Sequence, residues 1–198
     1  MAFQIPDAGN RVFLTFDDGP VPELCDFILD QLAVWKAGAT FFLVGENVVR
    51  HPDYAARIAG AGHRIGNHTH NHLNGFATPA DVYLENAGQA AAVLQPYLKS
   101  GQIPLFRPPY GKITPQQARR LRAAGFRLVM WDVLSKDYDS NLPVSVVVEN
   151  TLRHSEPGSI VVLHDNLKAG RNIREGLPLI LKGLQEKGLR PEALPDNF

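Results

Sequence analysis

Short β-rich runs alternate with longer amphipathic stretches from one end of the chain to the other, and this alternation limits the possible folds more than any other feature. The expected strands are 12–16, 40–44, 63–66, 105–107, 127–131 and 160–163, and the expected helices are 23–36, 53–61, 80–94, 116–124, 144–153 and 173–186. Repeated strand–helix units predict an α/β fold with a mainly parallel sheet, and about seven units favour a distorted (β/α) barrel over a small open sheet. After Gly188 no clear last strand follows, so we expect loose closure there.

The composition fits one folded domain and argues against two classes of partner. Apolar residues make up 44% of the 198 residues, and no linker, repeat or low-complexity segment interrupts them, so residues 1–198 are expected to form a single domain. Lys+Arg and Asp+Glu both number 20, and this zero net charge argues against a nucleic-acid binder, which needs a basic face. No apolar run approaches the roughly 18 residues of a membrane span, so no membrane partner is expected.

The N-terminal residues 1–8 have neither the basic nor the apolar region of a signal peptide. Their composition favours a cytoplasmic protein, or an exported one if a signal was removed ahead of this sequence. The single cysteine, Cys25, excludes an internal disulfide, and we interpret it as buried packing. No heptad pattern indicates an oligomer, so the oligomeric state stays open.

Polar residues gather where the expected strands end. Asp17 and Asp18 follow the first strand, a segment with three histidines at 67–72 follows the third, and His164 follows the last. Four of the 7 histidines fall in these positions, which packing alone does not explain. In barrels of parallel strands the chemistry lies on the loops at the carboxyl ends of the strands. We therefore expect the functional site at this edge.

The pair His68 and His72 indicates a metal site. Their i, i+4 spacing would place both imidazoles on one face of a helical turn, with His70 pointing away. An isolated pair of this kind is more often a solvated polar turn. Zinc binds nitrogen together with carboxylate oxygen, and either Asp17 or Asp18 could supply the oxygen, so the neighbouring aspartates favour a divalent metal.

The remaining polar residues suggest acid–base roles. Of the adjacent Asp17 and Asp18, one could bind a metal while the other acts as a base toward water, although such a pair could also cap the helix that follows. Arg107 could hold the base by a bidentate contact. A carboxylate such as Asp137 could fix the tautomer of His164 and raise its pKa, which would make His164 a general acid near neutral pH.

Five segments, 15–20, 68–72, 107–111, 131–137 and 162–164, resemble in order the five motifs of the NodB-homology polysaccharide deacetylases, carbohydrate esterase family four. The resemblance extends from about Val12 to about Gly188. It implies a distorted (β/α) barrel of the NodB-homology type and metal-dependent hydrolysis of an acetyl group from a sugar. It also implies zinc as the favoured divalent ion, with cobalt or nickel as alternatives, and an acetylated carbohydrate as the partner.

The resemblance assigns a role to each motif residue. It implies that Asp17 is the general base and that the metal ligands are Asp18, His68 and His72. It also implies that Arg107 orients Asp17, that the backbone N–H of Tyr110 stabilises the oxyanion, and that His164 is the general acid, oriented by Asp137. The chain departs from the family at Leu134, where relatives often have Asp, and at Tyr138, where they often have Trp.

The leading hypothesis is an N-deacetylase acting on N-acetylglucosamine units of chitin oligomers, peptidoglycan or a related glycan. An O-acetyl sugar esterase of the xylan type would use the same residues. Two further alternatives are a carbohydrate-binding relative without turnover and a hydrolase of small amides. The complete set of motif residues argues against the binding relative, and the short chain argues against the small-amide hydrolase.

Overall fold

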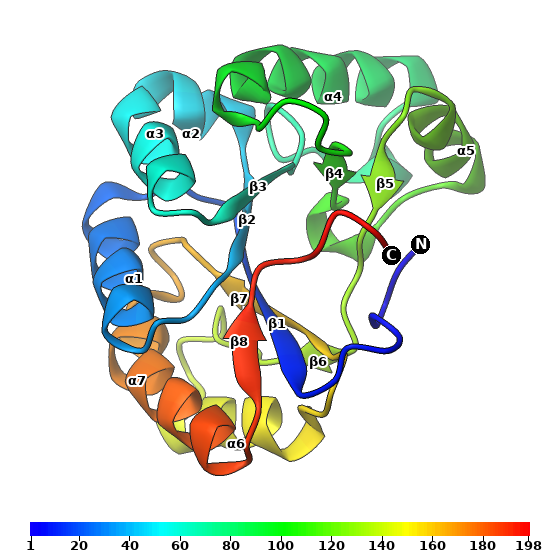
Figure 1. The fold of residues 1–198 in the computed structure, drawn as a ribbon. Helices are drawn as coiled ribbons and strands as arrows, with labels where there is room; N and C mark the ends of the chain where they lie inside the picture. The colour runs from blue at the N-terminus through cyan, green and yellow to red at the C-terminus, as the bar shows by residue number, and fades with distance from the viewer.

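The computed structural model describes residues 1–198, and its elements follow the alternation expected from the sequence (Figure 1). The strands are β1 (Arg11–Asp17), β2 (Thr40–Leu43), β3 (Arg64–Asn67), β4 (Leu105–Phe106), β5 (Arg127–Leu128), β6 (Val133–Leu134), β7 (Ile160–His164) and β8 (Arg190–Glu192). The helices are α1 (Pro22–Val34), α2 (Gly45–Arg50), α3 (Pro52–Gly60), α4 (Ala80–Leu94), α5 (Pro115–Ala123), α6 (Val144–His154) and α7 (Gly170–Glu186). The short β6 and α2 were not expected, because so few residues show no periodicity.

The strands run parallel in one curled sheet of order β5-β4-β3-β2-β1-β7-β6, with the helices around its outer side (Figure 1). The two ends of this order, β5 and β6, do not pair with each other, so the barrel is open between them. The N-terminal segment crosses the opening, because Ala2 bridges to Val129 and Gln4 bridges to Ser159. The distorted barrel predicted from the sequence is confirmed.

The expectation of no strand after Gly188 was wrong. Strand β8 pairs in parallel with the first half of β1, with Arg11 opposite Arg190 and Phe13 opposite Glu192. Strand β2 pairs only with the second half of β1, so the first half has free backbone groups on this side. The strand has three residues, including Pro191, and backbone pairing rather than an apolar run makes it, which is why the sequence gave no signal.

Alternation along β1 decides which side chains enter the barrel. Leu14 and Phe16 pack in the large core between the sheet and the outer helices. Phe13 packs in the smaller cluster inside the barrel. Because successive side chains of a strand point to opposite faces, Thr15 and Asp17 share the inner face with Phe13. The alternation that builds the core therefore also places the buried carboxylate of Asp17 on the inner face, at the carboxyl end of β1.

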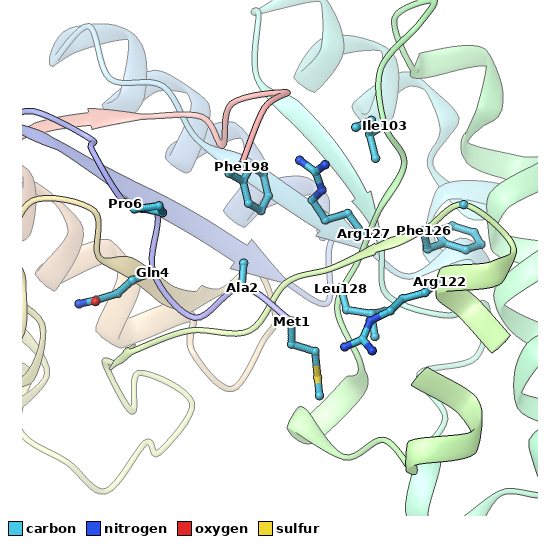
Figure 2. A pocket seen from close by; sticks show the side chains of 11 residues that line it. Met1, Ala2, Gln4, Pro6, Ile103, Arg122, Phe126, Arg127, Leu128 and Phe198 are labelled. Carbon is cyan, nitrogen blue, oxygen red and sulfur yellow. The ribbon is translucent and has the colours of Figure 1, made fainter. Parts of the chain in front are cut away.

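A cavity of about 570 Å³ lies by the amino ends of β4 and β5, at the opposite edge from the carboxyl ends of the strands (Figure 2). Its lining residues are Met1, Ala2, Gln4, Pro6, Ile103, Arg122, Gly125, Phe126, Arg127, Leu128 and Phe198. No histidine or acidic side chain lines it, so it offers neither a metal-ligand set nor an acid–base pair. None of the helices has the length and apolar character needed to cross a membrane.

Candidate active site

The carboxyl ends of the parallel strands meet at one edge of the barrel. In the register of the sheet, Asp17 at the end of β1 lies opposite His164 at the end of β7. Asn67 at the end of β3 lies opposite Phe106 at the end of β4. The loops after β1, β3, β4 and β7 therefore start from the same edge. Asp18, His68, His72 and Arg107 lie on the first three of these loops, and Asp137 lies on the loop after β6.

Three side chains from two of these loops face one another. Asp18, His68 and His72 each offer one ligand atom, and these atoms all lie within 4.8 Å of one another. The Oδ1 atom of Asp18 is 3.0 Å from Nε2 of His72 and 3.5 Å from Nε2 of His68. The Oδ2 atom of Asp17 is 4.0 Å from Nε2 of His68. The geometry thus separates the two aspartates, because Asp18 belongs to the three-residue group and Asp17 lies beside it.

The loop that carries the two histidines is not the helical turn that their spacing predicted. Residues 68–72 are not helical, and Thr69 and His72 have left-handed φ angles of 64° and 54°. Two reversals of the backbone, rather than a helical repeat, bring the imidazoles of His68 and His72 to the same side. His70 lies outside the group, and its Nδ1 packs so closely on Gly45 that a Cβ there would lie 2.5 Å away.

Amide side chains hold this loop in place of helical hydrogen bonds. Oδ1 of Asn86, on α4, accepts hydrogen bonds from the backbone N–H groups of His70 at 2.8 Å and Asn71 at 3.0 Å. Oδ1 of Asn67 accepts from the N–H of Thr69 at 2.8 Å. Both asparagines are buried, so the loop is fixed from the protein interior.

The outer nitrogen of each imidazole has its own partner. Nδ1 of His68 lies 2.8 Å from the carbonyl oxygen of Arg107. A carbonyl only accepts, so Nδ1 carries a proton, and Nε2 of His68 is left as the ring atom that faces Asp18 and can ligate an ion when the imidazole is neutral. Nδ1 of His72 lies 3.1 Å from the hydroxyl of Tyr110. This is the orientation that a metal-ligating histidine needs.

The carboxylate of Asp18 completes a donor set suited to a cation. Burial opposes its ionisation, but hydrogen bonds with His68 and His72 outweigh burial and hold the pKa of Asp18 well below its ordinary range. Two imidazole nitrogens and one carboxylate oxygen are ligands that zinc and similar divalent ions accept. The side chains of this structure therefore fit a divalent metal at Asp18, His68 and His72.

A buried arginine holds the carboxylate of Asp17. Nη1 of Arg107 donates to Oδ1 of Asp17 at 2.7 Å and to Oγ1 of Thr15 at 2.6 Å. Nη2 of Arg107 donates to the carbonyl of Met130 at 2.8 Å, and the guanidinium lies 4.2 Å from the centroid of the Phe42 ring. Burial lowers the pKa of Arg107, and Asp17 opposes this effect. The contact uses one Nη atom and not the bidentate pair expected from the sequence, because Met130 occupies the other.

Across the β1–β7 pair, a carboxylate holds the imidazole of His164. Nδ1 of His164 lies 2.7 Å from Oδ1 of Asp137, and Oδ2 of Asp137 accepts from the backbone N–H of His164 at 2.7 Å. The hydroxyl of Ser135 donates to the same carboxylate at 2.9 Å. Burial lowers the pKa of His164, but the charge and hydrogen bond of Asp137 outweigh burial and raise this pKa to about 9. His164 is therefore protonated at neutral pH.

Two exposed tyrosines pack against the site histidines. The Tyr110 ring lies edge-on to His72 at a centroid distance of 4.7 Å, and the Tyr138 ring lies edge-on to His164 at 5.1 Å. Tyr110 has a left-handed φ of 60°, which turns its backbone sharply after β4. Tyr138 thus packs as an aromatic residue at the position where the chain departs from the family. Leu134 lies on β6 and is half-buried.

Sequence reasoning missed or misplaced some polar residues. Asp132 directly follows the expected strand 127–131, but its carboxylate accepts from the backbone N–H of Ile160 at 2.6 Å, near the amino end of β7. Sequence reasoning did not single out Ser135, Asn86 or Asn166, although Nδ2 of Asn166 donates to Oδ2 of Asp18 at 2.6 Å. Single asparagines and serines in loops are common, so only the three-dimensional arrangement could identify them.

Comparison with known proteins identifies the family. A family model described as "Polysaccharide deacetylase" matches residues 4–129. A peptidoglycan-N-acetylglucosamine deacetylase of Bacillus cereus is 36% identical over 201 residues, which cover 100% of this chain and 71% of that protein. This chain belongs to the polysaccharide deacetylase family. A chitooligosaccharide deacetylase of Rhizobium leguminosarum bv. trifolii is 34% identical over 159 residues, covering 79% of this chain and 72% of that protein.

Solved structures agree with this assignment. A crystal structure of a peptidoglycan N-acetylglucosamine deacetylase has a TM-score of 0.92 and 34% identity, covering 99% of this chain and 91% of that one. A family 4 carbohydrate esterase from Streptomyces lividans, in complex with acetate, has a TM-score of 0.84 and 26% identity, covering 96% and 95% of the two chains. The resemblance drawn from the five sequence motifs is therefore confirmed, and so is the NodB-homology type of the barrel.

Proposed function

We propose that this chain is a metal-dependent deacetylase that removes N-acetyl groups from N-acetylglucosamine units of peptidoglycan, chitin oligomers or a related glycan. The observation that carries the proposal is the joint arrangement at one barrel edge. A two-histidine, one-aspartate group lies beside a carboxylate fixed by Arg107, and an imidazole fixed by Asp137 ends the neighbouring strand. The substrate class follows the relatives, which are named for peptidoglycan and chitooligosaccharide deacetylation.

Asp18, His68 and His72 would hold the divalent ion, and zinc is the ion that best fits this donor set. Three protein ligands leave a coordination position open, which distinguishes a catalytic zinc site from a structural one. Such an ion, when bound, acts as a Lewis acid toward a carbonyl oxygen and lowers the pKa of water.

In this proposal Asp17 is the general base that takes a proton from the attacking water. Its carboxylate is buried and would be costly to keep ionised alone, but the charge of Arg107 compensates it at 2.7 Å. The backbone N–H of Tyr110 would donate to the oxyanion of the tetrahedral intermediate, and one such donor lowers the barrier by about 3–4 kcal/mol.

His164 would be the general acid. A departing amine must be protonated to leave, and the imidazole is protonated at neutral pH because Asp137 raises its pKa to about 9. Asp137 and Ser135 would fix the ring so that Nε2 carries the proton to be donated. An ester needs this proton less than an amide does. A strong dependence of the rate on His164 is therefore expected for N-acetyl substrates.

The test is acetate release from N-acetylated chito-oligosaccharides by protein stripped with EDTA and then supplied with zinc, cobalt or nickel. We expect metal-dependent release that Asp17→Asn and His72→Ala abolish. His154→Ala is the matched control, because His154 is an exposed histidine at the end of α6 and should leave the rate unchanged.

An O-acetylated xylo-oligosaccharide serves as the competing substrate. Faster release from this ester than from the amide, with little effect of His164→Asn, would replace the N-deacetylase assignment by an O-acetyl esterase. No release from either substrate by zinc-loaded protein would contradict both activities.

A further inference from the structure

The two oxygens of the Asp18 carboxylate have different partners. Oδ1 faces the metal group, at 3.0 Å from Nε2 of His72 and 3.5 Å from Nε2 of His68. Oδ2 instead accepts a hydrogen bond of 2.6 Å from Nδ2 of Asn166. Asn166 lies in the loop after β7, two residues beyond His164, so this bond joins the loops that follow β1 and β7.

The orientation of the Asn166 amide is fixed by its other end. Oδ1 of Asn166 accepts from the backbone N–H of Ala169 at 2.9 Å, just before α7 begins. A backbone N–H can only donate and an ionised carboxylate can only accept. The amide therefore has one satisfactory orientation, with its NH₂ group toward Asp18.

The backbone of Asp18 is fixed as well. Asp18 has a left-handed φ of 79°, and its carbonyl accepts from Nδ2 of Asn47, on α2, at 2.8 Å. With the main chain held, rotation about χ1 and χ2 is the remaining freedom of the side chain. Asn166 is the one partner that restrains this rotation from the side away from the histidines.

We propose that Asn166 is a positioning residue that presents Asp18 to the metal as a one-oxygen ligand. This inference rests on the proposed function. With Oδ2 occupied by the amide, only Oδ1 is free to bind the ion beside His68 and His72. Without the amide, the carboxylate turns freely, so the site is less organised and both oxygens can approach the ion. Mutation of a group that orients a metal ligand in this way typically weakens metal binding by about 10–100-fold.

The test measures zinc affinity by competition with a chromophoric chelator, using Asn166→Ala, Asn166→Ser and wild-type protein. Serine keeps a short oxygen that can accept from the N–H of Ala169 but cannot also reach Asp18. Lys168→Ala is the matched control, because Lys168 is exposed in the same loop. We expect both Asn166 variants to bind zinc about 10–100-fold more weakly than wild type, and Lys168→Ala to bind within twofold.

Two further readouts separate positioning from folding. The melting temperature of the metal-free Asn166→Ser protein should equal that of metal-free wild type, because the contact before α7 is kept. The cobalt-substituted variants should show weaker visible absorption bands than wild type, since a second carboxylate oxygen raises the coordination number of the ion. A merely structural role of Asn166 would not change the cobalt spectrum.

The outcomes distinguish this inference from the proposed function. Zinc affinity and cobalt spectrum within error of wild type in Asn166→Ser, with wild type metal-loaded and active, would overturn only the role of Asn166. Absence of zinc binding in wild-type protein would overturn the proposed function and this inference together.

Discussion

Arg107 shows how one buried side chain supports both stability and the proposed chemistry. It is fully buried and is the charge partner of Asp17. We expect Arg107→Met to lower the free energy of unfolding by about 3–5 kcal/mol, because removing one member of a buried ion pair leaves the other uncompensated. Urea unfolding at neutral pH measures the loss. Adding Asp17→Asn should recover part of it, and a double variant no more stable than Arg107→Met would contradict the ion-pair explanation.

The His164–Asp137 pair gives a stability that depends on pH. Its folded pKa of about 9 lies above the ordinary histidine value. A raised histidine pKa adds stability that is fully present below the unfolded pKa of about 6.5 and is lost as pH rises through the folded value. In metal-free protein, wild type should exceed Asp137→Asn by about 1–3 kcal/mol near pH 6, and most of this excess should disappear by about pH 10. Denaturant unfolding at the two pH values tests this, and an excess independent of pH would exclude the mechanism.

Asp165 also makes stability fall as pH rises, but for another reason, because burial disfavours its charged form. It is buried, one of its oxygens has no hydrogen-bond partner, and burial raises its pKa to about 7. The folded protein therefore holds a proton that the unfolded chain releases near pH 4, so stability falls as pH rises from about 4 to about 7. We expect Asp165→Asn to be more stable than wild type by about 1–3 kcal/mol at pH 8 and equal to it near pH 4. Thermal unfolding at both pH values measures the difference, and a less stable variant at pH 8 would refute this account.

At the scale of elements, the sequence predicted the helices and strands that have a periodic apolar pattern and missed the short strands that have none. The long helices α4 and α7 and the apolar strands β1, β2 and β7 lie where the pattern placed them. The short β6 and β8 have two and three residues, and pairing with β7 and β1 defines them rather than their own side chains. Such elements exist only because a neighbouring backbone is available, which a single sequence does not record.

The turn before β7 tests how closely the N-terminal segment fits the barrel. Gly158 has a φ of +90°, and a Cβ there would lie 2.3 Å from the carbonyl oxygen of Ile5. Gly125 has the same φ but nothing within 4 Å. Both Gly→Ala changes carry the backbone penalty of about 1–2 kcal/mol, but only Gly158→Ala also forces two backbones apart. Chemical denaturation should show Gly158→Ala to be at least about 1 kcal/mol less stable than Gly125→Ala. Equal losses of unfolding free energy would mean that the N-terminal segment at Ile5 moves aside without destabilising the fold.

At the scale of the whole molecule, the candidate site exists only where distant loops meet. The sequence placed Asp18, His68 and His72 together through a motif resemblance, since their residue types alone left Asp17 and Asp18 equivalent. The alternation along β1 and the left-handed φ of Asp18 separate these two carboxylates. The supporting residues Asn166 and Ser135 act through contacts between loops, and no local spacing could have revealed them.

Because the three proposed ligands come together only in the folded chain, zinc should stabilise the whole molecule. A ligand present at about 100 times its Kd adds about 2.7 kcal/mol to the free energy of unfolding. For a chain of 198 residues this corresponds to a rise in Tm of about 5–11 °C above EDTA-treated protein. Differential scanning calorimetry with and without zinc measures the rise, with His72→Ala expected to remove it and His154→Ala to keep it. An unchanged Tm in millimolar zinc would mean that the loops do not bind the ion as a unit. A rise that His72→Ala does not reduce would place the ion elsewhere, because linkage reports only on ligands that the folded state brings together.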